Sequence, residues 1–581
     1  MPHTRMQKRL EAEAAPAPRL KLGHALRECL KEGYGWKDYR HDLLAGIDVG
    51  IVALPLSMAF AIASGIKPEH GLYTAIIAGA IIGILGGSRV LVSGPTAAFV
   101  VILVPITHQY GLGGLMTASV LAGVMLCAMG LFRMGRLIEF VPYPVTTGFT
   151  AGIATVIALL QIPSFLNLSL PKDMPDGTLE KAGVIWDTLP TWKPHDAAIG
   201  TFTLLLLLVW PKISKRIPAA LLAVTVAALA AHLLSKLIPG FSVETIQSKF
   251  NGIPQELPSF MLPWNNPGAT GAPLGLSWHL VKELVPAAFT IAVLGAISSL
   301  LAAVVADAMT GQRHDPDAEL FAQGVGNIVA PFFGGFTATG AIARSAAGIR
   351  AGARSPFTAL THSAFVLLAV LVLAPLLGYL PMASLAALLF TVAWNMCEFK
   401  HALHVLKVAP QSDSVVLLTC IGLTAVFDMV IAVSVGVVLA ALLFMRRMAE
   451  VSGVRLIGAD HPALKDPLPP GVLMYEIAGP LFFGAAQKAM SELRLLDGGG
   501  VKIVLLDLRS VPAMDATGLV NLDSAVERLQ GRKIFVIIGG LQVQPASVLE
   551  KAGWNDEEGK LALRRSFEDA LALARKSATS N

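Results

Sequence analysis

Long apolar runs separated by short polar segments fill most of the chain. Their centres lie roughly at residues 53, 79, 99, 121, 150, 203, 227, 296, 326, 346, 366, 388, 419 and 437, and a helix that spans a bilayer needs ~20 residues. The last two runs fit as separate spans if the chain turns near Phe427 and Asp428. The pattern predicts a polytopic α-helical membrane protein with 14 spans.

Basic residues fall on one side of this arrangement. With 14 spans, one set of loops carries Arg89, Arg133, Arg136, Lys212, Lys215, Arg216, Arg313, Arg350, Arg354, Lys400, Lys407, Arg446 and Arg447. The opposite loops near 109, 334, 378 and 427 carry none, and the two long loops on that side, 161–195 and 240–280, carry only a few lysines. Residues 1–40 are basic, lack the apolar core of a signal peptide and predict a short interfacial helix near His24–Glu32. By the positive-inside rule, both termini are cytoplasmic.

Fourteen spans divide into two sevens, and the second seven would enter the membrane in the opposite sense. Inverted repeats of this kind place a site near the midplane, between broken helices. The third span opens Ser93-Gly-Pro-Thr-Ala-Ala98 and the tenth opens Thr337-Ala-Thr-Gly-Ala341. These matching small-residue starts predict a pair of half-helices. A mid-span proline, Pro55, fits either a kink or a span that lines a cavity.

The segment around the tenth span, residues 331–356, breaks the rules for an ordinary span. It holds Gly334, Gly335 and Gly340 and then Arg344. A cation at bilayer depth costs at least ~2.5 kcal/mol, which favours a functional role. A helix start also presents free backbone N–H groups at the positive end of its dipole. We therefore predict a half-helix aimed at an anion.

Composition supports a membrane protein without catalytic chemistry. Hydrophobic residues make up 54% of the chain and charged residues 15%, and the mean hydropathy is +0.63; soluble domains carry roughly 25% charged residues. The four cysteines form no CxxC pair, and the sequence shows no nucleophile with its base. The histidines, which include His362, His401 and His404, form no metal cluster in the sequence. We expect no enzyme activity, no cofactor, no metal and no nucleic-acid partner.

After Glu450 the composition becomes that of a soluble domain, beginning with a proline-rich linker. Short apolar runs at 472–478, 501–508 and 533–538 predict strands. Helical spacing predicts helices at 485–496, 518–529 and 546–551. Alternating strands and helices indicate a small α/β layer fold. Asp515 and Thr517 lie at a strand-to-helix turn, where either can cap the helix.

Several motifs resemble the SulP anion transporters of the sulfate permease superfamily. They are Asp42-Leu-Leu-Ala-Gly-Ile-Asp-Val-Gly-Ile-Val-Ala-Leu-Pro-Leu-Ser-Met-Ala-Phe-Ala, Gly71-Leu-Tyr, Gly86-Gly-Ser-Arg, Ser93-Gly-Pro-Thr-Ala-Ala and Gly334-Gly-Phe-Thr-Ala-Thr-Gly-Ala-Ile-Ala-Arg-Ser. Runs at 93–102, 371–377, 392–396 and 427–432 look especially like the family's C4-dicarboxylate transporters. The turn at Asp515-Ala-Thr-Gly resembles that of STAS domains, in which the hydroxyl matching Thr517 is a phosphorylation site in some proteins.

The resemblance implies four segments. They are a cytoplasmic segment at 1–40, a transmembrane transporter domain at 41–447, a linker at 448–470 and a cytoplasmic STAS domain at 471–578. Within the transporter domain, spans 1–4 and 8–11 would form a core domain that slides as an elevator against a gate domain of spans 5–7 and 12–14. A homodimer in a bacterial inner membrane is expected.

The resemblance also implies a site for a small anion, of the C4-dicarboxylate, sulfate or bicarbonate class, between half-helices 3 and 10. Carried over by position, the site residues are Leu56, Phe60, Thr96, Ala343 and Arg344. Backbone N–H groups of Ala97, Ala98, Gly340, Ala341 and Ile342 would donate to the anion.

One position departs from the family pattern. Proton-coupled members carry a glutamate on span 8 where this chain aligns Ser298, and a sodium-coupled bicarbonate relative carries an aspartate there. Serine cannot carry the proton, which makes proton symport doubtful and favours exchange or uniport unless another acid, such as Glu139 or Glu283, substitutes. A channel-like anion pathway and an anion receptor that does not transport remain open alternatives.

Overall fold

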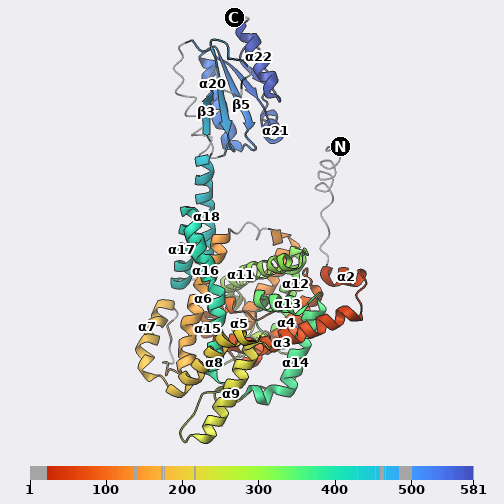
Figure 1. Ribbon diagram of the computed structural model, residues 1–581, viewed down its shortest axis with the longest axis vertical. Coiled ribbons are helices and arrows are strands. Elements are labelled where there is room, and N and C mark those ends of the chain that lie inside the picture. Colours follow the sequence, from red (N-terminus) through yellow and green to blue (C-terminus); the bar gives the residue numbers. More distant parts are fainter. Residues whose placement is uncertain are drawn as a thin grey trace. The chain divides into compact units, whose positions relative to one another are not determined.

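The computed structural model describes residues 22–136, 142–171, 174–175, 177–214, 217–427, 429–451, 453–457, 464, 466–482 and 500–579. Two compact units, Met1–Val437 and Val438–Asn581, divide the chain (Figure 1). Three sequence expectations, namely the structure of residues 1–21, Glu139 as a substitute acid and the helix at 485–496, lie outside the described residues.

In the described residues of the first unit, the regular structure is helical apart from two short strands, β1 (Ser93–Gly94) and β2 (Thr339–Gly340). The α-helices are α2 (His24–Lys31), α3 (Trp36–Ala63), α4 (Pro68–Leu85), α5 (Ala97–Leu131), α6 (Tyr143–Leu166), α7 (Thr178–Thr188), α8 (Pro194–Ile213), α9 (Ala219–Leu237), α10 (Ile246–Phe250), α11 (Trp278–Thr310), α12 (Pro316–Val329), α13 (Ile342–Ala351), α14 (Phe357–Leu377), α15 (Met382–Cys397), α16 (Phe399–Val408), α17 (Gln411–Val426) and α18 (Met429–Val451), the last of which crosses the division between the units.

Each predicted span centre falls within a helix. The third and fourth centres share α5, which is interrupted at Gly111, where φ is 65° and ψ is −166°. The tenth centre falls in α13, whose 10 residues extend only ~15 Å at 1.5 Å per residue. Among the described helices, nine are long and apolar enough to cross a membrane. The polytopic helical fold is therefore confirmed, while the number of spans stays a prediction.

Large apolar side chains on the outer helices are exposed in the isolated chain. Leu205 on α8, Leu229 on α9 and Leu368 and Val372 on α14 are each more than half exposed. Exposed apolar surface on this scale marks an interaction surface, and on helices of this hydropathy the surrounding medium is lipid. These faces therefore contact the bilayer.

The membrane helices pack in two groups. One group contains α3, α4, α5, α11, α12, α13 and α14, which contact one another, and the other contains α6, α8, α9, α15, α16 and α17. α3 also touches α9 and α15 of the second group, and α5 touches α6. Both short strands and the helices that follow them belong to the first group.

The first span is not broken at its proline. α3 is helical from Trp36 to Ala63 with Pro55 inside it. The side chain of Asp42 on α3 binds the backbone of residues 354–355. This fully buried carboxylate accepts the N–H groups of Arg354 (2.7 Å) and Ser355 (3.2 Å) and the hydroxyl of Thr358 (2.8 Å). Asp42 thereby anchors the turn between α13 and α14.

A five-stranded sheet forms the second unit, in the order β3 (Gly453–Ile457), β4 (Val472–Ala478), β5 (Ile503–Ser510), β6 (Phe535–Gly539) and β7 (Leu561–Leu563). β3 pairs antiparallel with β4, and the remaining neighbours pair in parallel. The helices are α20 (Ala516–Gly531), α21 (Val543–Lys551) and α22 (Phe567–Thr579). The predicted strands at 472–478, 501–508 and 533–538 and the predicted helices at 518–529 and 546–551 are confirmed within a few residues.

Side chains along β5 point alternately into two buried clusters, one on each face of the sheet. Val504 and Leu506 share a buried cluster with residues of α20 and α21. Ile503 and Leu505 share another with residues of α22. Because successive side chains of a strand point to opposite faces, α20 and α21 cover one face of the sheet and α22 covers the other. The unit is a three-layer α/β fold.

Candidate functional site

β1 and β2 place the two predicted half-helices beside each other. Ser93 pairs with Gly340 and Gly94 with Thr339 in an antiparallel register. α5 begins three residues after β1, and α13 begins two residues after β2. Strand residues 245 and 247 positions apart therefore bring two helix N-termini together. Neither N-terminus has a side-chain cap.

A polar stripe on α12 supports both strands. Gln323 donates one hydrogen bond to the hydroxyl of Ser93 and another to Glu319, each of 2.9 Å. Asn327 exchanges two hydrogen bonds with the backbone of Ala338, of 2.7 and 2.9 Å. The carboxylate of Glu319 accepts the N–H groups of Gly87 (3.0 Å) and Ser88 (3.2 Å). Residues at i, i+4 and i+8 share one helix face, so a single face of α12 holds the approach to both half-helices.

The three residues of this stripe were not among the predicted site residues. Its signal is present in the sequence, as three polar residues spaced by four in an otherwise apolar run. α11 adds a hydroxyl pair to the support. Ser299 lies 2.6 Å from the hydroxyl of Thr339 and accepts the N–H of Gly340 at 3.1 Å.

Arg344 reaches from the first turn of α13 to the segment that precedes α5. Its Nη2 donates to the carbonyl of Pro95, and a Cβ on Gly94 would lie 2.5 Å from its Nη1. The side chain is 3% exposed, and Nη1 has no hydrogen-bond partner in the described structure. Each helix N-terminus carries about half a positive charge. The guanidinium therefore adds its full charge where two positive dipole ends meet.

The backbone donors that remain free differ from the predicted set. Gly340 donates its N–H to Ser299, and Ala341 donates to the carbonyl of Val92 at 3.0 Å. Strand pairing and the α11 hydroxyl use these two groups, so the expectation that Gly340 and Ala341 present free donors is wrong. The N–H groups of Ala97, Ala98, Ile342 and Ala343 form no hydrogen bonds within the described structure.

The remaining predicted site residues lie on α3 and α5. Leu56 and Phe60 are both buried, and their spacing of four puts them on one face of α3, which packs against α5 and α13. The hydroxyl of Thr96, immediately before α5, is buried without a described partner, as is that of Ser57 on α3. Ile342 and Ala343, at the start of α13, are exposed. The arrangement combines apolar walls, two hydroxyls and one cation.

Ser298 contributes less to the support of β2 than its neighbour Ser299 does. It is partly buried and makes no hydrogen bond among the described residues, whereas Ser299 supports β2. Across the described residues, no group of three or more His, Cys, Asp or Glu side chains could hold a metal ion.

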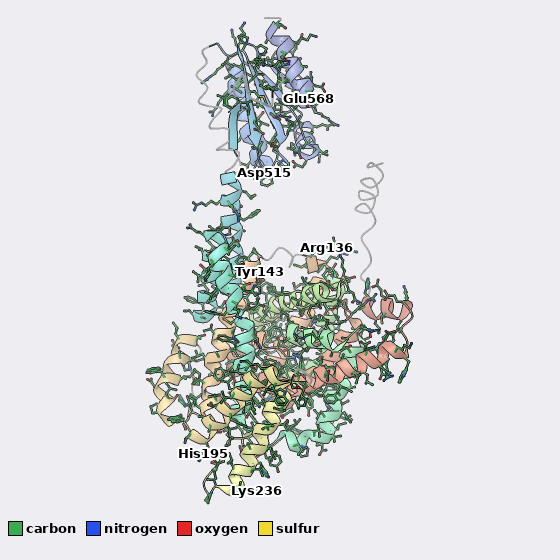
Figure 2. All side chains as sticks on the ribbon, in the orientation of Figure 1. Arg136, Tyr143, His195, Lys236, Asp515 and Glu568 are labelled. Carbon is green, nitrogen blue, oxygen red and sulfur yellow. The ribbon has the colours of Figure 1, made fainter. Side chains whose placement is uncertain are left out.

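In the second unit, Asp515 caps α20. Its Oδ1 accepts the N–H of Gly518 at 2.7 Å, and Figure 2 labels its side chain. The backbone carbonyl of Thr517 accepts a hydrogen bond from Asn521 one turn later. Of the two capping candidates, Asp515 is the one that fills the role. Thr517 as a phosphorylation site stays a prediction.

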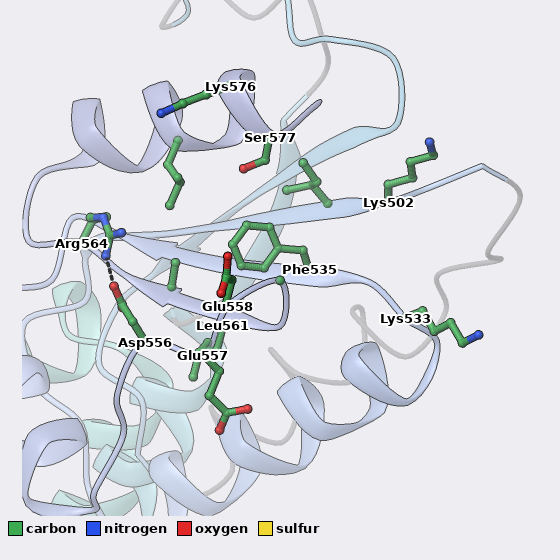
Figure 3. A pocket seen from close by; sticks show the side chains of 14 residues that line it. Lys502, Lys533, Phe535, Asp556, Glu557, Glu558, Leu561, Arg564, Lys576 and Ser577 are labelled. Carbon is green, nitrogen blue, oxygen red and sulfur yellow. Dashed lines mark hydrogen bonds and ion pairs between the residues drawn. The ribbon is translucent and has the colours of Figure 1, made fainter. Parts of the chain in front are cut away.

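A cavity of about 840 Å³ lies in the second unit, near the starts of β5 and β6 (Figure 3). Its lining includes Lys502, Lys533 and Asp556 and the ion pair between Asp556 and Arg564, which measures 2.6 Å. The N–H of Leu563 and then Arg564 hold the pKa of Asp556 below its ordinary value. Because both signs of charge line this cavity, its electrostatics do not select an anion.

Comparison with known proteins agrees with this architecture. The sequence profile of the sulfate permease family matches residues 39–420, and that of the STAS domain matches residues 464–570. A Bacillus subtilis (strain 168) protein named "Putative sulfate transporter YvdB" is 40% identical over 532 residues, which cover 91% of this chain and 96% of that protein.

More distant relatives extend the comparison. The "Bicarbonate transporter BicA" of a Picosynechococcus species is 27% identical over 539 residues, covering 89% of this chain and 91% of that protein. The fold resembles that of the murine solute carrier 26 family member A9 anion transporter in an inward-facing state, with a TM-score of 0.82, 18% identity and 98% coverage of both chains. The profile matches and the YvdB relationship show that this chain belongs to the sulfate permease family of anion transporters and carries a C-terminal STAS domain.

Proposed function

We propose that the chain is a secondary transporter that holds a small oxyanion between the N-termini of α5 and α13. The observation that carries the proposal is the pairing of β1 with β2, which brings uncapped helix starts and the unpaired Nη1 of Arg344 together. Charge-assisted hydrogen bonds from backbone N–H groups and a guanidinium suit a sulfate, bicarbonate or carboxylate oxygen. Leu56 and Phe60 supply the apolar side of the site.

Sulfate and bicarbonate are the substrates that we favour. The YvdB and BicA relatives bear those names, whereas the C4-dicarboxylate expectation rests on short sequence runs. A small oxyanion carries several acceptor lone pairs on one compact group. This matches a site built from several single donors rather than from two separated positive groups.

Alternating access by an elevator motion is supported by the two packing groups of helices. The group that contains α3, α5 and α13 holds every proposed site residue, so it can carry the anion as a body against the group of α6, α8 and α15. We assign the first group to the core domain and the second to the gate domain. The segment boundaries at 1–40, 41–447, 448–470 and 471–578 belong to the same proposal.

The proposal also covers the orientation of the chain in the membrane and its oligomeric state. The asymmetry of the loop charges supports an orientation with both termini in the cytoplasm, and we propose that the protein works as a homodimer in a bacterial inner membrane. Membrane-impermeant labelling of single cysteines added at each terminus tests the orientation, since labelling of intact cells at either end contradicts it. The molecular mass of the purified protein in detergent tests the dimer.

Uptake into proteoliposomes tests the transport function. The purified protein should accumulate labelled sulfate or bicarbonate, and Arg344→Ala should lower uptake at least tenfold, because removing a charge-assisted donor costs roughly 1.5–3 kcal/mol. Arg350→Ala is the matched control, since this exposed arginine lies on the last turn of the same helix. Normal uptake by a folded Arg344→Ala protein would contradict the assigned site.

A further inference from the structure

Buried polar atoms without partners gather around the candidate site. In the described structure they include the hydroxyls of Ser57 and Thr96, Nη1 of Arg344 and both ring nitrogens of His362. A buried donor or acceptor that lacks a hydrogen bond costs about 1–3 kcal/mol, so each calls for a functional or structural reason. Thr96 and Arg344 belong to the proposed anion site. His362 has no role there yet.

His362 lies on α14 and is fully buried. A Cβ on Gly79 of α4 would lie 3.8 Å from Nδ1 of His362 and 3.3 Å from the carbonyl oxygen of Ser93. A Cβ on the next residue, Gly94, would lie 2.5 Å from Nη1 of Arg344. Gly79 therefore lies beside both the imidazole of His362 and the carbonyl of Ser93, and the guanidinium of Arg344 lies beside Gly94, the next residue of β1.

Arg344 of α13 is the charged residue of the proposed anion site, and its guanidinium lies beside Gly94 of β1. The helices packed against α14 are α3 and α4. On α3, the titratable residues before Asp42 precede Gly46, which faces Thr361 of α14, by five to nine residues, or ~7–14 Å along the helix; they are Lys37, Asp38, Tyr39, Arg40 and His41. Asp42 is bonded to Ser355 and Thr358, and Asp48 is exposed. On α4, Glu69, His70 and Tyr73 precede Gly79 by six to ten residues, which is ~9–15 Å along the helix. Glu319 is bonded to Gly87, Ser88 and Gln323.

We propose that His362 takes up one proton when a dianion occupies the site, so that a dianion and a proton cross together. This inference rests on the proposed function. A protonated imidazole beside the guanidinium would place two like charges in one buried region. A bound dianion supplies two negative charges, of which Arg344 balances one and the imidazolium balances the other. A monoanion is already balanced by Arg344.

The proton step is simple in chemical terms. The neutral imidazole accepts a proton from water on the side to which the site is open, the N–H bond forms, and the site then holds two positive and two negative charges. The same proton returns to water when the dianion leaves on the opposite side. Binding linkage is reciprocal: the dianion favours protonation of His362, and a lower pH favours dianion binding. The titratable group that is absent at Ser298 is thereby supplied by α14.

The first test uses the unmodified protein. Proteoliposomes loaded with a pH-sensitive dye should take up protons together with sulfate, at a ratio near one, and should take up few or none with nitrate. Sulfate affinity should strengthen as the pH falls, by up to about tenfold per pH unit, which is the limit for a single linked proton. Sulfate uptake without proton uptake, or equal proton uptake with nitrate, would overturn the proposal.

Variants then assign the effect to the residue. His362→Gln keeps a polar side chain of similar size and should flatten the pH profile of sulfate uptake, reducing it more than nitrate uptake. His232→Gln, at an exposed position on α9, is the control and should keep the wild-type profile. An unaltered pH profile in His362→Gln overturns the role of His362 and leaves the anion site intact. Absence of uptake of any anion by the wild type would instead overturn the proposed function.

Discussion

Arg344 is buried without a carboxylate to balance it. None of the ion pairs in the described part of the chain includes this residue, and its one hydrogen bond goes to the carbonyl of Pro95. Removing one partner of a buried charge pair is strongly destabilising because it leaves a charge uncompensated, so a buried guanidinium in this state calls for an anion. A transported substrate meets that need while it is bound. The cost of burying Arg344 is then part of what gives the site its affinity.

Gly94 sets how closely the guanidinium approaches β1. An added methyl group would lie 2.5 Å from Nη1 of Arg344. Because this separation is shorter than Cβ atoms show in real structures, the guanidinium must shift. We expect Gly94→Ala to weaken sulfate binding roughly tenfold, about 1.4 kcal/mol, with the protein still folded. Equilibrium binding of labelled sulfate to the purified protein measures this.

Gly422→Ala is the control for that substitution. Gly422 lies on α17, and a methyl group there would meet nothing within 4 Å. Equal sulfate affinity in Gly94→Ala and Gly422→Ala would show that the position of the Arg344 side chain beside β1 does not matter for binding.

At the scale of elements, α12 acts as the support for two half-helix starts that are remote in sequence. Asn327 forms hydrogen bonds with both the N–H and the carbonyl of Ala338, and an apolar side chain can form neither. Asn327→Leu should leave both groups unpaired, and each buried unpaired group costs about 1–3 kcal/mol. We therefore expect a lower melting temperature and a loss of sulfate uptake that exceeds the loss of protein in the membrane.

Asn327→Asp provides a sharper comparison. An aspartate keeps the acceptor for the N–H of Ala338 but loses the donor to its carbonyl, so its effect should lie between those of wild type and Asn327→Leu when thermal unfolding is measured. A melting temperature of Asn327→Leu equal to that of wild type would contradict the supporting role of α12.

Helix positions were predictable because periodicity and hydropathy are local properties of the chain. The short α13 was predictable as well, since Gly334, Gly335 and Arg344 interrupt the apolar pattern. The local sequence pattern could not predict which distant segments pair with each other. The register of β1 with β2, the use of the Gly340 N–H by Ser299 and the position of His362 beside Gly79 all depend on residues far apart in sequence. Pro55 shows the same limit: a proline removes one backbone hydrogen bond, but packing against neighbouring helices decides whether the helix continues through it, as α3 does.

At the scale of the whole molecule, a transporter whose core group carries the anion must move that group once per cycle. Collective motions of domains take microseconds to milliseconds, so turnover should stay at or below ~10³ per second. Sulfate flux into proteoliposomes with a known number of proteins per vesicle measures this rate. Ohmic single-channel currents in planar bilayers would support the channel-like alternative and contradict the elevator.

The central claim is that the anion lies between the N-termini of α5 and α13. Crystals of the protein grown with selenate, a sulfate analogue with a strong anomalous signal, test it without relying on transport. The anomalous peak should lie beside Nη1 of Arg344 and the N–H groups of Ala97 and Ile342, with oxygens at charge-assisted distances of roughly 2.7–2.9 Å. It should be absent from Arg344→Ala crystals. A selenate peak located elsewhere in the membrane unit, and retained in Arg344→Ala, would contradict the account.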